Sequence, residues 1–465
     1  MEKFLNIVFI LITVKVCSQN VMTIEKVNEL FFLNSYEFKI IENNFSQQNI
    51  EADFYNLSLL PKITSSINFP YQRSISEVIQ SDGSQRFIER NFLNSTINFD
   101  ISQVVPLTGG TINFSSSING ARDFNNNVSN FSSNWANISY NQTVNGYNNL
   151  KWNKKLNFLI IKKDSLNYLK EKIKLKYEIS KIYVDTQLQQ LKTDKIAENI
   201  KKTKSILFEL EEKLKFGRTI KLEVEQTKMT LKQLNRQIEI SKGEYSAGLQ
   251  LLKRKIGTDL DFELQPVTQE EFVFNKKDLK SSIINNGFDL DKTIKLLQIE
   301  SNIEKVKKEG AISINLQMGM GLNSTSDELK FLYDTPSQSQ FFSIGTKIPI
   351  IDWGVSKKKY TIACLEKSKA ELEFLQNEGE IDEDLDNMSN YKSSLVFQIQ
   401  SLKEQILISN NIDEMFVDLL KNGRKTIAEY KSQIAESFNI TVEHQKAVND
   451  LYLLKLKINE INLIF

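Results

Sequence analysis

The sequence has 465 residues, and its 59 Lys and Arg nearly balance its 58 Asp and Glu, leaving a formal net charge of +1. That balance argues against a nucleic-acid partner, which would require a strong basic excess. Histidine occurs once and cysteine twice, so the chain offers little for a His-ligated zinc site or a catalytic triad, and we expect no enzymatic activity, cofactor or metal.

The N-terminus has the pattern of a secretory signal peptide spanning residues 1–18. Lys3 supplies a positive charge, residues 4–14 form a short apolar run, and small residues follow at Cys17 and Ser18. Lipid attachment at Cys17 is a less favoured alternative, because Lys15 and Val16 are poor neighbours for lipoprotein processing. After cleavage Cys364 stands alone, which excludes an intramolecular disulfide.

Downstream, the first half of the chain changes from a helical pattern to alternation. Residues 23–60 look helical and end before Pro61, since proline disfavours helical geometry in the residue before it. Apolar residues then alternate with polar ones in four segments, 63–71, 97–101, 112–118 and 136–144, with a turn at 106–110.

The second half contains two clearer alternating segments, 312–322 and 342–350, separated by a polar loop. Their length suits transmembrane β-strands, which need about nine to eleven residues with one apolar face. A half-buried hairpin in a soluble sheet would show the same alternation, so these strands alone leave both readings open.

Two very long helices favour the membrane reading. Residues 147–214 and 354–420 are rich in Lys, Glu, Leu and Ile and nearly free of Gly and Pro, and each would be about 100 Å long. Shorter helical stretches, 219–256 and 278–309, would together match one long helix. The C-terminal stretch carries the 3.5-residue seam of a coiled coil, formed by Ala447, Leu451, Leu454, Ile458, Ile461 and Phe465.

The landmarks occur twice. Gly217 and Gly423 each end a long helix and lie 206 residues apart, and the last strand of each half precedes a Lys-rich helix start. A repeat of this size indicates two copies of one structural unit. We therefore expect a first repeat at 19–256, a connecting segment at 257–275 and a second repeat at 276–465. The first repeat carries an extra hairpin at about 85–130, whose role as barrel wall, plug or projection stays open.

This order of elements, given twice behind an export signal, resembles the TolC family of outer-membrane efflux factors. Four local sequences carry the resemblance: Leu59-Leu-Pro-Lys-Ile63, Gly146-Tyr-Asn-Asn-Leu-Lys-Trp152, Ile348-Pro-Ile-Ile-Asp-Trp-Gly354 and Gly423-Arg-Lys-Thr-Ile-Ala-Glu429. The resemblance implies a mixed α-helical and β fold. Long antiparallel coiled-coil helices would join a few transmembrane strands per chain, and three copies would close a β-barrel and a helical tunnel.

The same resemblance implies a function and partners. The homotrimer would lie in outer-membrane lipid with its helices in the periplasm, and would be the exit duct of an efflux or type I secretion system. It would receive substrates passively from an inner-membrane pump through a periplasmic adaptor. The alternatives are a periplasmic adaptor or coiled-coil scaffold that does not conduct and, less favoured, a surface adhesin stalk.

A channel gate is implied near the glycine turns, where the family has an acidic ring and polar ties. By the match at Gly423, Glu429 takes the place of the first ring acid, whereas Ser432 replaces the second. Lys425 stands where the family often has a basic tie, and Glu223, with Glu225 nearby, is the first-repeat counterpart of Glu429. A solvated helix face is the alternative for all four.

Overall fold

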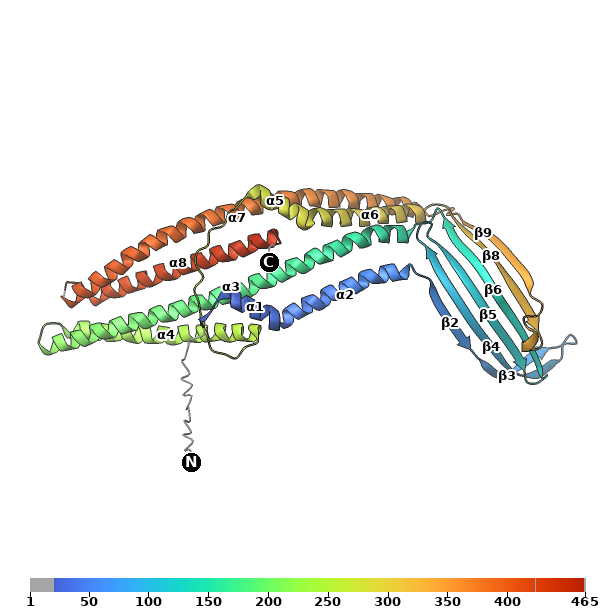
Figure 1. Ribbon diagram of the computed structural model, residues 1–465, viewed down its shortest axis with the longest axis horizontal. Coiled ribbons are helices and arrows are strands. Elements are labelled where there is room, and N and C mark those ends of the chain that lie inside the picture. The colour runs from blue at the N-terminus through green and yellow to red at the C-terminus, as the bar shows by residue number, and fades with distance from the viewer. Residues whose placement is uncertain (1–20, 423, 464–465) are drawn as a thin grey trace, which may run out of the picture. The chain divides into compact units, whose positions relative to one another are not determined.

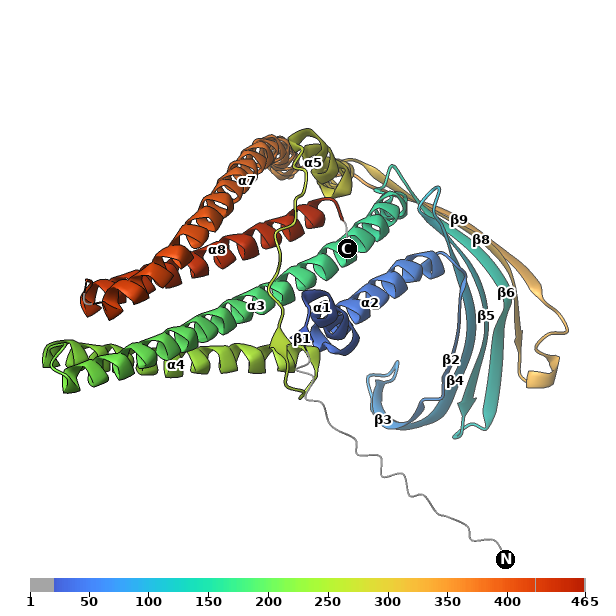
Figure 2. The ribbon, with the colours of Figure 1, turned by 60° about the vertical axis from the view of Figure 1, so that its left-hand side comes forward.

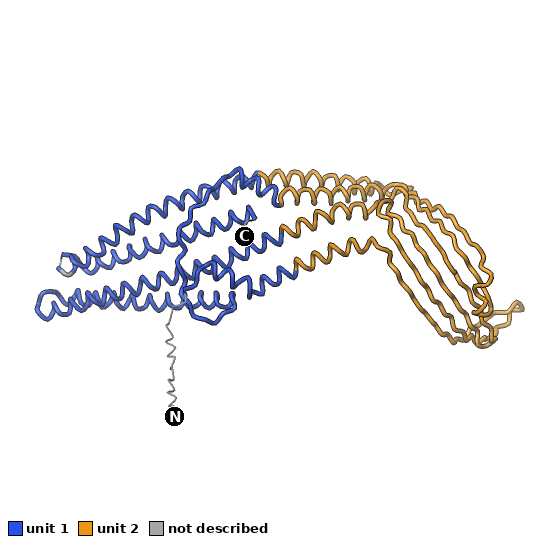
Figure 3. The backbone as a smooth tube through the Cα atoms, in the orientation of Figure 1, with its two compact units in different colours: residues 1–43, 167–286, 379–465 blue, residues 44–166, 287–378 orange. Residues whose placement is uncertain are grey.

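The computed structural model describes residues 21–422 and 424–463, which form two compact units (Figures 1 and 3). The predicted signal peptide and Cys17 lie outside the described residues. Unit 1 comprises 21–43, 167–286 and 379–463, and unit 2 comprises 44–166 and 287–378. Three helices, α2 (Tyr36–Ser58), α3 (Asn149–Lys215) and α7 (Val355–Lys421), have residues in both units.

Unit 1 is mainly helical. Besides its parts of α2, α3 and α7 it contains α1 (Ile24–Asn34), α4 (Lys221–Ile256), α5 (Lys276–Ile283) and α8 (Ile427–Ile461). A π-helical turn, Ile284–Phe288, connects α5 to α6 (Asp289–Glu309), which belongs to unit 2. Two short strands, β1 (Val21–Met22) and β7 (Glu263–Leu264), pair in parallel.

The two helical hairpins of unit 1, α3–α4 and α7–α8, have the same turn. The amide of Arg218 donates to the carbonyl of Lys213 at 2.8 Å, and that of Arg424 donates to Leu419 at 2.9 Å. Both pairs are offset by 206 residues, as the duplicated sequence predicts. Apolar residues of all four helices, among them Ile206, Val224, Leu420 and Tyr430, form one buried cluster behind these turns.

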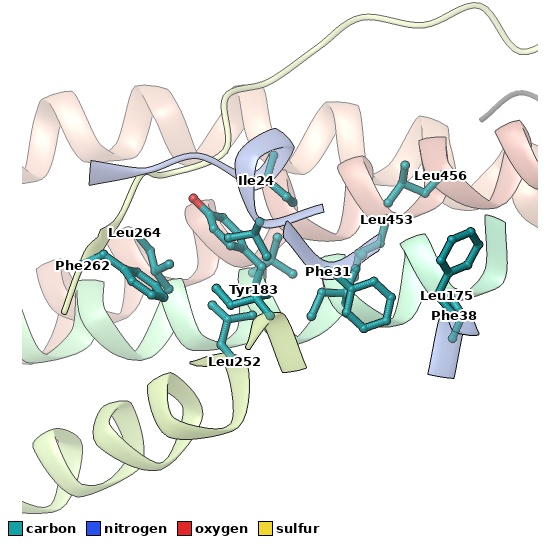
Figure 4. Packing of buried hydrophobic residues seen from close by; sticks show 14 residues of the cluster. Ile24, Phe31, Phe38, Leu175, Tyr183, Leu252, Phe262, Leu264, Leu453 and Leu456 are labelled. Carbon is teal, nitrogen blue, oxygen red and sulfur yellow. The ribbon is translucent and has the colours of Figure 1, made fainter. Parts of the chain in front are cut away.

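A second buried cluster of unit 1 centres on Tyr183 of α3 (Figure 4). The Tyr183 hydroxyl lies 2.7 Å from the carbonyl oxygen of Met22 and 2.8 Å from that of Gln265. Burial raises the pKa of this hydroxyl, so it stays protonated and can donate to either carbonyl. The contact fixes β1 and β7 against α3.

The first predicted helix is interrupted, which the sequence analysis missed. Ser35 has an extended backbone and separates α1 from α2, and its Oγ accepts a hydrogen bond from the amide of Phe38 at 3.0 Å. Serine is a preferred N-cap residue because its side chain satisfies a free amide of the first turn. A continuous helix over 23–60 is therefore a wrong prediction.

Unit 2 holds a seven-stranded antiparallel sheet in the described part of the chain. Its strands are β2 (Lys62–Asn68), β3 (Tyr71–Ile79), β4 (Gln85–Val105), β5 (Gly110–Asp123), β6 (Val128–Val144), β8 (Ser313–Ser326) and β9 (Ser337–Lys347). They lie side by side in the order β2-β4-β5-β6-β8-β9, and β3 pairs with the far end of β4 (Figure 2). A 3₁₀ turn, Leu329–Phe331, lies in the loop between β8 and β9.

β2 and β3 occupy one position in the sheet. Residues 96–102 of β4 pair with β2 and residues 85–93 pair with β3, along the same edge of β4. Pro70 interrupts the strand, because proline has no amide to donate to the ladder. The first repeat therefore fills four sheet positions and the second repeat, with β8 and β9, fills two.

Candidate functional site

The sheet of unit 2 has one apolar and one polar face. Paired residues share a face, and successive residues alternate between faces, so the register assigns each side chain. The apolar face carries Ile63, Ile67, Ile97, Phe99, Ile101, Ile112, Phe114, Ile118, Ile138, Tyr140, Ile314, Leu316, Met318, Met320, Leu322, Phe342 and Ile344. The polar face carries Thr64, Ser66, Asn98, Asp100, Ser102, Thr111, Asn113, Ser115, Ser117, Asn137, Ser139, Asn141, Asn315, Gln317 and Ser343.

The apolar face has the height of a bilayer core. On β8 every second residue from Ile314 to Leu322 is apolar, a nine-residue stretch that rises about 26 Å at about 3.3 Å per residue. Tilted strands of nine to eleven residues span the hydrocarbon region. Many of these side chains have no protein covering them; Met320 is 60% exposed and Phe342 is 65% exposed. Exposed apolar area on this scale marks a surface that meets lipid or another protein.

The polar face is almost without charge. Lys62 and Lys347 lie at the end of the sheet nearest the helices, and Arg86, Arg90 and Asp123 lie at the opposite end. Between them, in the described strands, Asp100 is the single charged residue of this face. Hydroxyl and amide side chains make up most of the rest, which suits a surface in contact with water.

Aromatic and large aliphatic residues gather at both ends of the apolar region. At the distal end, Tyr71 and Phe124 pack edge to face with ring centroids 6.1 Å apart, and Trp135 contacts Tyr333 at the same distance. At the helix-proximal end, Leu107, Ile350 and Trp353 are nearly fully exposed. Aromatic residues at both rims are typical of membrane-spanning sheets, where they sit at the level of the lipid headgroups.

The sheet also has two free edges in the described residues, β2 with its continuation β3 and, at the other side, β9. Each presents unpaired backbone amides and carbonyls, which lipid cannot satisfy. If the apolar face meets lipid, both edges must therefore pair with further strands from outside this sheet.

At the tip of the α7–α8 hairpin, the predicted gate residues Glu429 and Lys425 contact each other. Their charged groups are 2.7 Å apart, and both side chains are partly exposed. Glu429 also accepts hydrogen bonds from the amide of Thr426 at 2.9 Å and from its hydroxyl at 3.0 Å, and Thr426 accepts from the Glu429 amide. This is a capping box that starts α8. Lys425 and these Thr426 bonds lower the pKa of the Glu429 carboxyl to about 2.

Lys425 makes its described contacts within its own hairpin. Besides Glu429, its ammonium lies 5.5 Å from the ring centroid of Phe416 on α7. Ser432, at the second acidic place, is exposed. The tip thus brings two of the four predicted gate residues together.

At the tip of the α3–α4 hairpin, Glu223 and Glu225 point to different partners. Glu223 accepts a hydrogen bond from the Thr219 hydroxyl, the position one turn earlier. Glu225 lies 3.7 Å from Lys228, which is itself 3.2 Å from Glu211 on α3. The first-repeat counterpart of the capping threonine is Ile220, which has no side-chain cap. The two tips therefore differ in chemistry although they share the corresponding backbone hydrogen bonds of Arg218 and Arg424.

Residues 380–386 of α7 are mostly acidic, and two of them have ion-pair partners on α5. Asp386 lies 2.5 Å from Lys276, and Asp382 lies 2.7 Å from Lys280 on α5. The four-residue spacing on both helices was the available signal, because it aligns residues on one face of each.

Among the described residues, none of the helices combines the length and apolar character needed to cross a membrane.

Comparisons of sequence and of structure give different results. No model of a known protein family matches the chain, and no curated protein matches it. Solved structures match over nearly its whole length. A structure of CusC, described in terms of transmembrane channel formation, has a TM-score of 0.68 at 12% identity and covers 94% of this chain and 91% of its own.

Two further structures agree. The CmeC outer membrane channel of Campylobacter jejuni has a TM-score of 0.65 at 14% identity, covering 95% of this chain and 86% of its own. The outer membrane protein VceC of Vibrio cholerae has a TM-score of 0.66 at 9% identity, covering 94% and 96%. At these identities the likeness concerns the fold, and it agrees with the resemblance found in the sequence. The chain therefore has the fold of the TolC-like outer-membrane channels.

Proposed function

We propose that this protein is a subunit of an outer-membrane exit duct, whose sheet joins the sheets of sister chains to form a closed barrel. The observation that carries the proposal is the two-faced sheet with free edges. Its exposed apolar face suits lipid, its nearly uncharged polar face suits a water-filled pore, and the edges need strands that a single chain does not supply. The fold shared with outer-membrane channels supports the same reading.

The duct would be a homotrimer in the outer membrane, with the helices of unit 1 in the periplasm as an antiparallel coiled-coil tunnel. It would receive substrates from an inner-membrane pump through a periplasmic adaptor, in an efflux or type I secretion system. The chain would have no catalytic role and would conduct passively, with energy supplied by the pump.

The gate would lie at the hairpin tips, with Glu429 and Lys425 as its principal residues and Glu223 and Glu225 as weaker contributors. The Lys425–Glu429 pair supports this placement, because an ion pair within one hairpin can exchange for a pair with a neighbouring chain at little cost. The capping box gives Glu429 a second role in starting α8.

The proposal is tested by cell fractionation, followed by mass measurement and planar-bilayer recording on purified protein. We expect the protein in the outer-membrane fraction, as a trimer that forms ion-conducting channels. Recovery with the periplasm or the inner membrane, without conductance, would instead support the adaptor or scaffold alternative.

A further inference from the structure

The extra hairpin of the first repeat lies inside the sheet. β4 and β5 are inserted between β2 and β6, and β5 pairs with β4 over its whole length, from Gly110 to Asp123. On its other side β5 pairs with β6 with one irregularity near Ser116. If the hairpin were a plug or a projecting loop, β2 and β6 would be neighbours in the sheet. Instead, the two complete strands β4 and β5 separate β2 from β6.

The inserted strands have the same two faces as the rest of the sheet. Phe99 and Ile101 of β4 pair with Ser116 and Phe114 of β5 on the apolar face. Asn98 and Ser102 lie on the polar face of β4. The duplicated strands β8 and β9 show the same division. The hairpin thus has the chemistry of a membrane wall.

Side chains at the start of α3 hold the hairpin level with the other strands. Asn148 donates from Nδ2 to the carbonyl of Pro106 at 3.0 Å, and its Oδ1 caps α3 by accepting from the amide of Lys151. Gln142 of β6 donates to the carbonyl of Thr108 at 2.8 Å. The turn between β4 and β5 is therefore tied to the same junction at which β6 becomes a helix.

The two free edges of the sheet are complementary to each other. β9 runs toward the helices and β2 runs away from them, so β9 of one copy can pair in antiparallel fashion with β2 of the next. Phe342 and Ile344 would continue the apolar face into Ile63 and Ile67. No sheet edge would then remain open to lipid.

We propose that three copies of this chain close a barrel of eighteen strands, because each supplies six sheet positions rather than the four that two equal repeats would give. The inference rests on the proposed function. Barrel diameter grows roughly linearly with strand number, and barrels of 16–18 strands leave an aqueous channel. Relative to twelve strands, the diameter would be about 1.5-fold larger and the cross-section about 2.3-fold larger. With Asp100 as the one charge of its polar face between the two ends of the sheet, the pore would admit bulky polar solutes of either sign.

The test uses two deletions designed from the strand register. Gln72 is level with Phe92, Asp123 and Val128, so removing residues 73–123 joins Gln72 to Phe124 and keeps the natural turn before β6. This variant should form four sheet positions per chain. The control replaces residues 74–90 with Asn-Gly between the paired residues Arg73 and Asn91, which shortens the distal end of the β3–β4 hairpin but keeps all six positions.

Electron cryo-microscopy of the trimers in lipid nanodiscs gives the strand number directly. Polyethylene glycols of graded size, added on the barrel side during bilayer recording, report the largest polymer that enters the barrel. We expect eighteen strands for the wild type and for the control, and twelve for the 73–123 deletion, with a polymer cutoff diameter about 1.5-fold smaller in the deletion.

A conducting wild-type trimer with twelve strands would overturn the inference while leaving the proposed function intact. Equal polymer cutoffs in the wild type and a folded deletion would also overturn it. If the deletion does not fold, the strand count of the wild type decides. A wild type that neither trimerises nor conducts would refute the proposed function itself.

Discussion

The two faces of the sheet predict opposite results for the same substitution at neighbouring positions. Met318 lies at the centre of the apolar stretch from Ile314 to Leu322, and Gln317, the preceding residue of β8, lies on the polar face. In the proposed membrane barrel, Met318→Arg would place a guanidinium at the middle of the bilayer. Gln317→Arg would place it beside Asn141 and Ser343, its uncharged neighbours on the adjoining strands.

The expected cost follows from the depth of each position. An arginine facing lipid at the midplane destabilises a membrane barrel by about 2–4 kcal/mol, and positions facing the lumen are largely insensitive. Met318→Arg should therefore lower the equilibrium constant for folding by a factor of about 30 to 1,000, whereas Gln317→Arg should change it little.

The assay is refolding into lipid vesicles followed by denaturant titration, with tryptophan fluorescence or heat-modified gel mobility as the readout. A midpoint shift for Met318→Arg, absent for Gln317→Arg, is the expected result. Equal shifts for both variants, or a larger shift for Gln317→Arg, would refute the assignment of the faces.

Three further outcomes are expected. Glu429→Gln should weaken cation selectivity. Because the pKa of the Glu429 carboxyl is lowered to about 2, the wild-type selectivity that depends on its charge should stay constant from pH 8 down to about pH 4. The ionised carboxylate stabilises the fold at pH values above its ordinary pKa of 4.5, and this contribution is lost as the pH falls toward 2. Selectivity that is unchanged in the variant would reject the gate role. Tyr183→Phe should destabilise unit 1 by about 0.5–1.5 kcal/mol, because it removes the hydroxyl that donates to the carbonyl of Met22 or Gln265. The measurement is hydrogen exchange at β1 and β7, and unchanged exchange there would contradict the prediction. Lys276→Glu should lower the free energy of unfolding by at most about 1 kcal/mol, because Lys276 and its partner Asp386 are both partly exposed. Adding Asp386→Lys should restore the stability measured by thermal unfolding. A double variant that is less stable than the single one would exclude the pairing.

Regular elements could be predicted because their signal is periodic and local. The alternation at 312–322 leads directly to β8, and the scarcity of Gly and Pro over 147–214 leads to α3 within two residues. The break at Ser35 was missed because serine occurs both inside helices and at their N-caps, and only its hydrogen bond to Phe38 separates the two. The π-helical turn at Ile284–Phe288 likewise has no periodic signal; there Asn286 bonds to the carbonyl of Ile461, a contact 175 residues away.

The candidate site could be predicted in part. Alternation indicated strands with one apolar face, but the placement of β4 and β5 between β2 and β6 depends on pairing between distant segments, which one sequence does not encode locally. The Gly146–Trp152 match contains Asn148, but nothing in the sequence indicates its hydrogen bond to the carbonyl of Pro106. The position of Glu429 relative to Gly423 made it a gate candidate in the sequence. Its capping box with Thr426, a structural role, could be recognised only from the coordinates.

The insertion of β4 and β5 as a pair has a consequence for how such a protein can change during evolution. A single added strand would deliver the chain to the distal end of the sheet, and α3 would start at the wrong end. A complete hairpin returns the chain to the rim it left, so the helices need no redesign. The number of strands in the sheet can thus change by gain or loss of one continuous genetic segment, while α3 keeps its starting point at the same end of the sheet.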